Sequence, residues 1–226
     1  MAMGSGECDR MMAACRANGV KLSVAYYRHF YPLVGIIKEI LKSGEIGTTI
    51  LSQINAFEYF DPGVEESRTW YFNKEKAGGG PMMDFGCHRI EVLLNLFGAV
   101  KRTVGVVSNV FFDREVEDSA TALFEFESGS RGVLTVTTAA YEAKDTLDIY
   151  GSRGSIHVPL LSRGRATILT EDEERDEDYP PHNNFHQPYI EAVTAAILTD
   201  SEVPVGGEIG RAVAKLEEEI YGLKER

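Results

Sequence analysis

Helical periodicity marks four segments of the chain. Apolar residues recur every three or four positions in residues 5–18, 33–42, 189–198 and 209–223. Ser5 is placed to cap the first of these helices, and Asn18-Gly19 is a typical helix end. In the third helix the spacing predicts four side chains that face inward: Ile190, Val193, Ala196 and Ile197.

Segments rich in Val, Ile, Thr, Phe and Tyr predict strands between the second and third of these helices. They are residues 48–59, 103–112, 119–127, 131–141, 146–150, 154–158 and 166–170. Gly/Ser turns at 127–130 and 151–154 predict antiparallel hairpins. The acidic run 171–178 predicts a solvated loop. Residues 20–26 are nearly all apolar, which is typical of a strand buried on both faces of a parallel layer.

This order of elements predicts an α+β fold. Its main part is a mostly antiparallel open sheet with helices on one face. The helix and buried strand at the front belong to a different kind of layer, and a single such repeat cannot bury itself. They therefore read as the remnant of another domain that precedes the sheet.

Composition and charge narrow the classes of partner. The chain has 226 residues, of which 43% are hydrophobic, so it can bury a sizeable core. Lys and Arg number 23 against 35 Asp and Glu, and the net charge of −12 argues against nucleic acid and anionic membranes as partners. Three cysteines at these spacings fit a reducing cytoplasm and no metal site. No stretch approaches the roughly 18 apolar residues that cross a bilayer.

The densest unusual stretch is 78–90, in which three consecutive glycines precede Asp84 and His88. The glycines permit close approach of the backbone to another body, but they form neither a dinucleotide fingerprint nor a phosphate loop. Asp84 and His88 are four residues apart, so at the start of a helix they share one face. A carboxylate beside an imidazole makes His88 a candidate base for a hydroxyl proton. The same spacing also fits a structural interpretation, in which Asp84 caps the helix and His88 is an ordinary helix residue.

A polar and aromatic group, residues 26–31, follows the predicted buried strand at its carboxyl end, where ligands bind in α/β sheets. Arg28 is as suited to binding a ligand as to a structural salt bridge, and Tyr27 fits an interface aromatic equally well. Trp70, the only tryptophan, is a candidate wall of a pocket or a core residue. The other histidines are predicted to be structural or exposed, with a capping or pocket role open for the last: His157, His182 and His186.

Taken in order, these motifs resemble the C-terminal part of the Gfo/Idh/MocA family, named for glucose-fructose oxidoreductase, inositol dehydrogenase and MocA. Residues 78–88, preceded by Trp70, resemble the family's most specific signature in this half, W…GGG-x-x-x-D-x-G-x-H. Four further segments also match. Residues 19–32 resemble the last Rossmann strand with its Y-x-R-R-F-x-P exit, and residues 44–47 resemble a G-x-I-G helix end. Residues 151–156 resemble a G-x-x-G-x-I hairpin, and residues 189–207 resemble the C-terminal helix with its P-V loop.

The resemblance implies a fold and a chemistry. Family members pair a Rossmann domain that carries NAD or NADP with a sheet domain like the C-terminal domains of dihydrodipicolinate reductase and glyceraldehyde-3-phosphate dehydrogenase. Hydride moves between the nicotinamide and a sugar, a polyol or a related carbonyl compound. By position, Asp84 would orient the substrate and His88 would be the general acid and base. Tyr27, Arg28 and Trp70 would bind substrate near the domain junction.

Two family features have no counterpart in the sequence: the dinucleotide fingerprint and the Lys of an E-K-P motif. We therefore expect most of the Rossmann domain to be absent. Residues 1–30 would be the remnant of its last helix and strand, and residues 31–226 the substrate-binding and oligomerisation domain. On this interpretation the chain binds no cofactor itself and is inactive alone.

The leading hypothesis is thus the C-terminal domain of an NAD(P)-dependent oxidoreductase that acts on a sugar or polyol and forms a homodimer or tetramer through its open sheet face. The alternative is a non-catalytic binding or assembly module that uses the same sheet for a partner. A third possibility, cofactor-assisted glycoside cleavage as in some relatives, would require the missing half.

Overall fold

A single mixed sheet forms the base of the molecule. The structure, a computed structural model, describes residues 1–62 and 67–222. Eight strands lie in the order β2-β3-β4-β1-β5-β6-β7-β8, and every neighbouring pair is antiparallel except β1 and β4. The predicted mostly antiparallel sheet is confirmed. The strands are β1 Thr49–Tyr59, β2 Val100–Ser108, β3 Ser119–Phe126, β4 Arg131–Thr137, β5 Ala139–Gly151, β6 Gly154–Leu160, β7 Arg165–Thr170 and β8 Glu174–Asp178.

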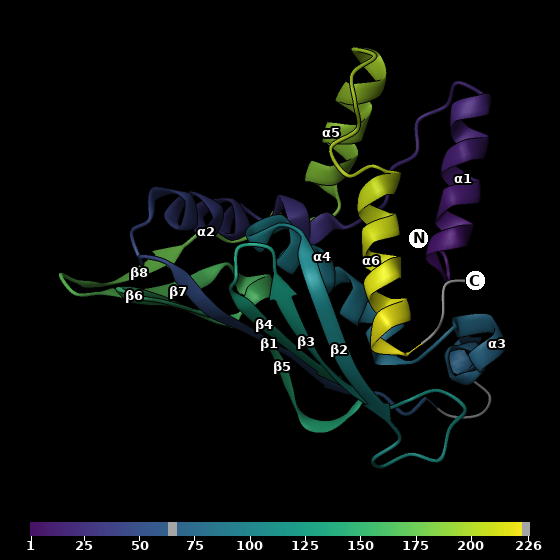
Figure 1. The fold of residues 1–226 in the computed structure, drawn as a ribbon, viewed down its shortest axis with the longest axis horizontal. Coiled ribbons are helices and arrows are strands. Elements are labelled where there is room, and N and C mark those ends of the chain that lie inside the picture. The colour runs from purple at the N-terminus through teal and green to yellow at the C-terminus, as the bar shows by residue number, and fades with distance from the viewer. Residues whose placement is uncertain (63–66, 223–226) are drawn as a thin grey trace.

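Helices cover one face of this sheet, as predicted. The α-helices are α1 Ser5–Ala17, α2 Pro32–Ser43, α3 Lys74–Ala77, α4 Cys87–Phe97, α5 Gln187–Leu198 and α6 Gly207–Ile220. Short helical turns are η1 Tyr27–Phe30, η2 Ser67–Phe72, η3 Met82–Gly86 and η4 Leu161–Arg163, of which η3 is a π-helix. Figure 1 shows α2, α4 and α6 on the upper face, while no helix of the described part of the chain lies on the lower face.

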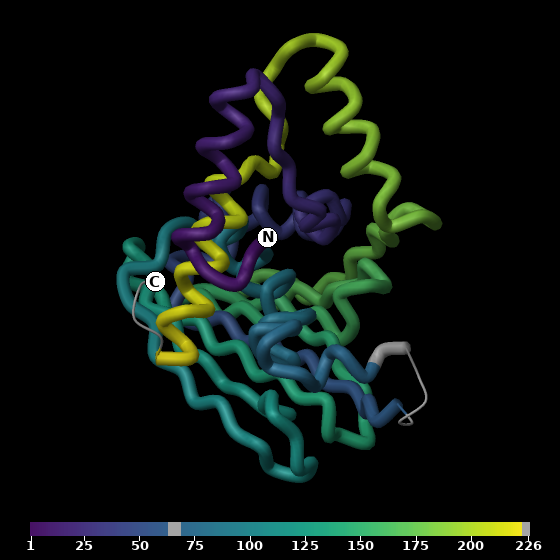
Figure 2. The backbone as a smooth tube through the Cα atoms, turned by 90° about the vertical axis from the view of Figure 1, so that its right-hand side faces the viewer, coloured from purple at the N-terminus to yellow at the C-terminus, as the bar shows by residue number. Residues whose placement is uncertain are grey.

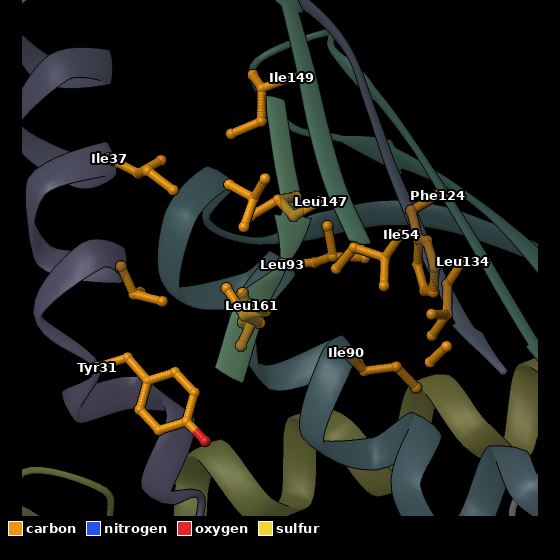
Figure 3. Close-up of a cluster of buried hydrophobic side chains, with 14 of the residues drawn as sticks. Tyr31, Ile37, Ile54, Ile90, Leu93, Phe124, Leu134, Leu147, Ile149 and Leu161 are labelled. Atoms are coloured by element: carbon orange, nitrogen blue, oxygen red, sulfur yellow. The ribbon is translucent and has the colours of Figure 1, made fainter. Parts of the chain in front are cut away.

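The core fills the space between α2, α4 and the inner face of the sheet (Figure 3). Alternation along each strand sends every second side chain inward, and the helical stripe of α2 meets them. Ile54, Phe124 and Leu147 from three strands are fully buried together with Ile37 and Ile90 from the helices. Each such side chain contributes about 1.5–3 kcal/mol on burial. This layer holds the N-terminal ends of α4 and η3 in place.

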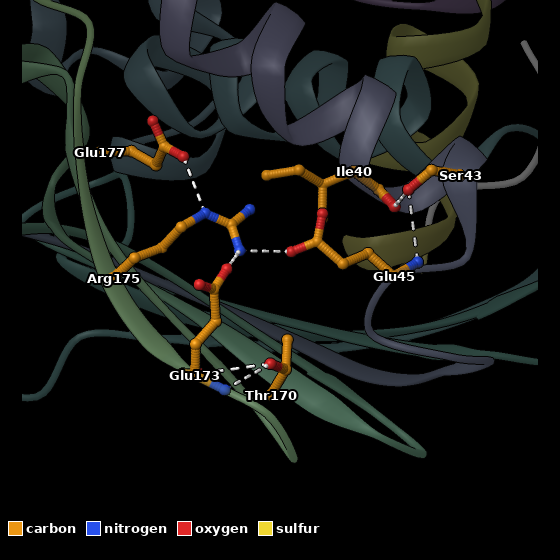
Figure 4. Close-up of polar contacts among 7 residues, drawn as sticks. All are labelled: Ile40, Ser43, Glu45, Thr170, Glu173, Arg175 and Glu177. Carbon is orange, nitrogen blue, oxygen red and sulfur yellow. Dashed lines mark hydrogen bonds and ion pairs between the residues drawn. The ribbon is translucent and has the colours of Figure 1, made fainter.

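Two strand predictions are corrected by the sheet. Residues 131–141 are not one strand, because the chain leaves β4 at Thr138 and crosses the end of β1. The backbone of Thr138 bonds Asp118 on one side and Phe60 on the other, which accounts for the break. The expected solvated loop at 171–178 instead contains β8, a charged edge strand. In Figure 4, Arg175 of β8 forms ion pairs to Glu45, Glu173 and Glu177.

The N-terminal segment departs from its predicted form. Residues 20–26 make one isolated bridge, Ser23 to Gly206, in place of a buried strand, and Val20 is 56% exposed. Ser5 is not the cap of α1, because Gly4 occupies that position and Ser5 donates to Glu218 from both its backbone and its hydroxyl. Figure 2 shows α1 running alongside α6.

Helix α5 rises away from the sheet instead of packing on it (Figure 1). Of the four side chains predicted to face inward, only Ala196 is buried. Ile190 and Ile197 are 53% and 58% exposed. The helical period of this segment was predicted correctly, but α5 contacts η1, through Tyr189 on Phe30, and leaves Ile190 and Ile197 exposed.

Candidate functional site

The glycine run before Asp84 is held by a buried carboxylate. The backbone N–H of Gly80 donates to Glu117 Oε2 at 2.8 Å, and that of Met82 donates to Oε1 at 3.3 Å. The hydroxyl of Tyr221 donates to the same carboxylate. A Cβ on Gly80 would lie 2.0 Å from the carbonyl oxygen of Glu117. Glycine is therefore required here by close packing within the chain.

Asp84 and His88 lie on consecutive turns, Asp84 in the π-helical turn η3 and His88 in α4. Asp84 is exposed and lines a narrow pocket, of about 20 Å³, together with Gly79 and Gly80. Partial desolvation raises the pKa of its carboxyl, while Arg89 lowers it. Nδ1 of His88 is buried without a hydrogen-bond partner in the described part of the chain. The carboxylate does not fix the imidazole tautomer through Nδ1 in this arrangement.

His88 is held neutral. Burial lowers the pKa of its imidazole to about 3, and the charges of Arg28 and Arg89 add to that effect. Its ring packs edge-on to Tyr26 and at 5.3 Å from the ring of Tyr27. At neutral pH the ring therefore carries one donor and one acceptor, with which it can orient a hydroxyl or a carbonyl group. The low pKa makes it a weak proton acceptor in the unliganded site.

Tyr27 contacts several other aromatic rings of the site. Besides His88, its ring lies 4.4 Å from the ring of His186 and stacks parallel to Phe185 at 6.4 Å. Sequence reasoning left His186 open, and the structure places it beside Tyr27 at the start of α5. Nothing in the local sequence signalled this contact, because 150 or more positions separate the two segments. The two residues meet because η1 and α5 pack against each other.

Arg28 and Arg89 both approach the carboxylate of Asp145. Nε and Nη2 of Arg89 contact Asp145 Oδ1 at 3.1 and 2.9 Å, and Nη2 of Arg28 lies 3.8 Å from Oδ2. All three residues are less than 10% exposed. They line a pocket of about 370 Å³, here called the Arg28–Arg89 pocket, with Ala56, Phe57, Glu58, Phe85, Ala143, Lys144 and Leu160.

Sequence reasoning missed Arg89 and Asp145. A signal for Asp145 exists, because it stands in the inward register of β5 with Leu147 and Ile149. An acid among inward apolar positions predicts a buried partner. Arg89 carried no comparable signal beyond its place next to His88.

Trp70, predicted to bind substrate, lies apart from the Arg28–Arg89 pocket. It is 44% exposed and stacks on Tyr71 at 4.0 Å, and Tyr71 lines the narrow pocket beside Asp84. His182 is exposed in a loop. His157 lies on the outer face of the sheet, where it contacts Asp148 at 2.7 Å and Ser155 at 2.9 Å.

The described residues do not form a dinucleotide phosphate site at the glycine run. The amides of Gly80 and Met82 point to a carboxylate, so the position that a phosphate would take is filled by Glu117. No group of three His, Cys, Asp or Glu side chains within residues 1–62 and 67–222 could hold a metal ion. Across the same residues, the helices are too short or too polar to cross a membrane.

Comparison of the sequence with known protein families identifies the family of this chain. The family model for the GFO/IDH/MocA C-terminal domain matches residues 35–157, more than half of the chain. The chain belongs to the Gfo/Idh/MocA family. This confirms the family that the motifs of the sequence resemble, and the match covers the segment from α2 to β6 that carries Asp84, His88, Arg89 and Asp145.

Relatives of this Gfo/Idh/MocA chain are longer than it is. Oxidoreductase P35 of Formosa agariphila is 26% identical over 98% of this chain and 69% of its own length. The uncharacterized oxidoreductase YrbE of Bacillus subtilis is 26% identical over 93% of this chain, which spans 62% of it. The structure of levoglucosan dehydrogenase in complex with NADH and levoglucosan superposes with a TM-score of 0.86 at 19% identity. It covers 98% of this chain, which matches 68% of that structure.

Proposed function

We propose that this chain is the substrate-binding and oligomerisation part of an NAD(P)-dependent oxidoreductase acting on a sugar, a polyol or a related carbonyl compound. The observation that carries the proposal is the neutral, partly buried His88 beside Tyr27 and next to the Arg28–Arg89 pocket. A pocket of about 370 Å³ suits a ligand of monosaccharide size. That a relative in fold is a dehydrogenase in complex with NADH and levoglucosan supports the carbohydrate class.

Each predicted residue takes a role in this proposal. His88 receives the proton of the reacting hydroxyl, or returns it to the oxygen of the carbonyl. Tyr27 and Arg28 contact the substrate at the Arg28–Arg89 pocket. Asp84, which lines the narrow pocket, orients a second hydroxyl, and Trp70, stacked on Tyr71 of that pocket, contacts the same end of the substrate. The dinucleotide supplies the hydride chemistry when it is bound. In this proposal residues 31–226 form the substrate domain, and residues 1–30 correspond to the last helix and strand of a Rossmann domain.

The experiment that tests the proposal measures carbohydrate binding to the chain by saturation-transfer NMR over a panel of sugars and polyols. We expect saturable binding of at least one of them. His88→Asn should weaken it about tenfold, the effect of one lost hydrogen bond of about 1.4 kcal/mol. His182→Asn, at an exposed loop histidine, is the matched control and should leave binding unchanged.

Two outcomes would contradict the proposal. If no carbohydrate in the panel binds, the assignment of residues 31–226 as a substrate-binding domain is overturned. Tight binding of NADH to this chain alone, measured by nicotinamide fluorescence, would show that the dinucleotide site lies within these residues and not beyond them. We also place the protein in the cytoplasm, since its three cysteines are unpaired.

The open face of the sheet supports the oligomerisation part of the proposal. On its β2–β3 edge Val104 faces Leu123 across the strands, and Val106 lies next to them. Their exposed fractions are 54%, 40% and 69%. A homodimer or tetramer would bury this apolar surface. Val106→Lys should shift the sedimenting species to the monomer, whereas Thr121→Lys, at a polar neighbour opposite Val106, should do so less.

The exposed face of α5 favours a second candidate function, a non-catalytic binding or assembly module. Ile190, Ile197 and Leu198 expose more than half of their surface. Such a module would hold its partner through apolar contacts and would not depend on His88. Copurification of a partner that is lost in Ile197→Lys and kept in His88→Asn would favour this candidate over the oxidoreductase.

A further inference from the structure

The Arg28–Arg89 pocket carries more positive charge than its own carboxylates neutralise. Two buried cations, Arg28 and Arg89, line it against Asp145 and Glu58, while Lys144, also in the lining, pairs with Glu142 at 2.6 Å. Of these acids only Asp145 is buried, since Glu58 lies exposed at the rim. The pocket is therefore positive inside a chain whose net charge is −12, and such a contrast draws anions from solution into the cleft.

Arg89 and Arg28 differ in how far their hydrogen bonds are used. The guanidinium of Arg89 is engaged on every nitrogen: two contact Asp145 and the third donates to the carbonyl oxygen of Phe85 at 3.0 Å. Arg28 donates from Nη1 to the hydroxyl of Tyr27 at 2.7 Å. Its Nη2 lies 3.8 Å from Asp145, too far for a hydrogen bond, and its Nε is buried without a hydrogen-bond partner among the described residues.

This leaves one buried cation underpaired. Arg28 is 8% exposed, so water cannot compensate its charge as it would at the surface. Buried guanidinium groups are normally matched by a carboxylate or phosphate, because an unpaired buried charge is costly. Asp145, the carboxylate that pairs with Arg28 at 3.8 Å among the described residues, is already held by Arg89. A second acidic group is the partner that Arg28 lacks.

We infer that the Arg28–Arg89 pocket recognises a carboxylate on the substrate, so that the substrate is an acidic sugar or polyol. The carboxylate would lie against Arg28, with Lys144 at the rim as a second cation, and Phe57 and Phe85 would flank the carbon chain. This inference rests on the proposed function, whose substrate class it narrows. A carboxylate there would also offset part of the charge that disfavours the imidazolium of His88, making His88 a better proton acceptor when the substrate is bound.

The test compares D-gluconate with D-glucitol, which have the same carbon chain and differ in a carboxylate against a hydroxymethyl group. Calorimetric titration of the chain should show at least about tenfold tighter binding of gluconate, as expected for a charge-assisted hydrogen bond. In Arg28→Met the two ligands should bind about equally well, whereas Lys144→Met should reduce the preference for gluconate by a smaller factor. Arg102→Met removes the same charge from an exposed position on β2 and should leave the preference intact.

The outcomes separate this inference from the function on which it rests. Equal binding of gluconate and glucitol overturns the carboxylate site and leaves the carbohydrate-binding function standing. Binding of neither overturns both. Inorganic phosphate that binds as tightly as gluconate also overturns the inference, because the pocket would then select charge without the polyol. Should Arg28→Met fail to fold, by its far-ultraviolet circular dichroism, Lys144→Met decides: an unchanged preference for gluconate overturns the site.

Discussion

The Arg28–Arg89 pocket and the carboxylates around α6 both place charge in the interior, and they deal with it in different ways. Glu117, Glu217 and Glu218 are each less than 10% exposed. Glu117 accepts from two backbone amides and Tyr221, and Glu218 accepts from Ser5. Donors of the chain thus satisfy Glu117 and Glu218, whereas Arg28 shares the carboxylate of Asp145 with Arg89, at 3.8 Å, and lines a pocket.

This difference separates a structural use of buried charge from a functional one. Glu117 and Glu218 bond segments that are far apart in sequence, so their carboxylates hold the fold together. Among the described residues no donor bonds Oε1 of Glu217. Burial, together with the nearby acids, raises its pKa to about 8, so it is neutral over much of the physiological range. An arginine has no such neutral form at these pH values, and Arg28 has to meet its charge with a partner.

The strongest test of the Arg28–Arg89 pocket removes the buried carboxylate that its two arginines share. Asp145→Asn leaves Arg28 and Arg89 without a carboxylate, and we expect a loss of about 3–5 kcal/mol in the free energy of unfolding in urea. Asp148→Asn is the control on the outer face of the same strand, where Asp148 pairs with His157. Its cost should stay below about 1 kcal/mol. Equal losses in the two variants would show that the pocket charges are as well solvated as the outer pair.

Gly80, whose backbone N–H donates to Glu117, provides a test of the buried carboxylates around α6. In Gly80→Ala the new methyl group meets the backbone of Glu117, and we expect the free energy of unfolding to fall by about 3 kcal/mol. Gly35→Ala, in α2 with nothing within 4 Å of the added atom, should instead stabilise by about 0.5–1 kcal/mol. A neutral effect of Gly80→Ala would mean that the turn relaxes and that Glu117 does not hold it tightly.

The pH dependence of stability tests whether Glu217 is neutralised. Its folded pKa of about 8 lies above its ordinary value of 4.5, so the folded chain binds the proton more tightly than the unfolded chain. Its contribution to stability is therefore largest below pH 4.5 and is lost as pH rises through 8. One pH unit between the two pKa values corresponds to about 1.4 kcal/mol.

Glu217→Gln, which keeps the shape and removes the ionisation, should therefore raise the thermal midpoint at pH 8 by more than it does at pH 5. A gain of about 1.4 kcal/mol or more is expected at the higher pH. Glu219→Gln, at the exposed position on the same helix, should shift both midpoints alike. A Glu217→Gln variant whose midpoint difference does not depend on pH would show that the carboxyl is ionised in the folded protein.

How far the sequence predicts this structure depends on the range of the interactions. The two hairpins, the helix periods and most strand positions follow from local alternation and were predicted, although β5 begins at Ala139, well before the predicted start at 146. The break at Thr138 and the charged strand β8 were not, because each depends on a neighbour distant in sequence: the end of β1 for Thr138 and the backbone of β7 for β8.

The site shows the same limit. Motif spacing predicted Asp84, His88, Tyr27 and Arg28 as candidates, and the structure places His88, Tyr27 and Arg28 close together. Arg89 and Asp145 were not predicted, and for His186 the structure supplies the contact with Tyr27 that the sequence left open. The roles of the candidates stay predictions until binding is measured. What the sequence could not provide is the partner of each charge, and that partner decides whether a buried group is structural or open to a ligand.

The smallest expected effect comes from the most heavily paired cation. Arg175 contacts Glu45, Glu173 and Glu177 at 2.6, 2.8 and 3.0 Å (Figure 4), and these carboxylates raise its pKa. The cluster is partly solvated at the sheet edge, so Arg175→Gln should cost below about 1 kcal/mol, and less still at high salt. Arg165→Gln, which removes the single exposed pair with Asp178, should cost a few tenths less. An Arg175→Gln loss as large as that of Asp145→Asn would mean that the number of ion pairs, and not their burial, determines what a charge contributes to this fold.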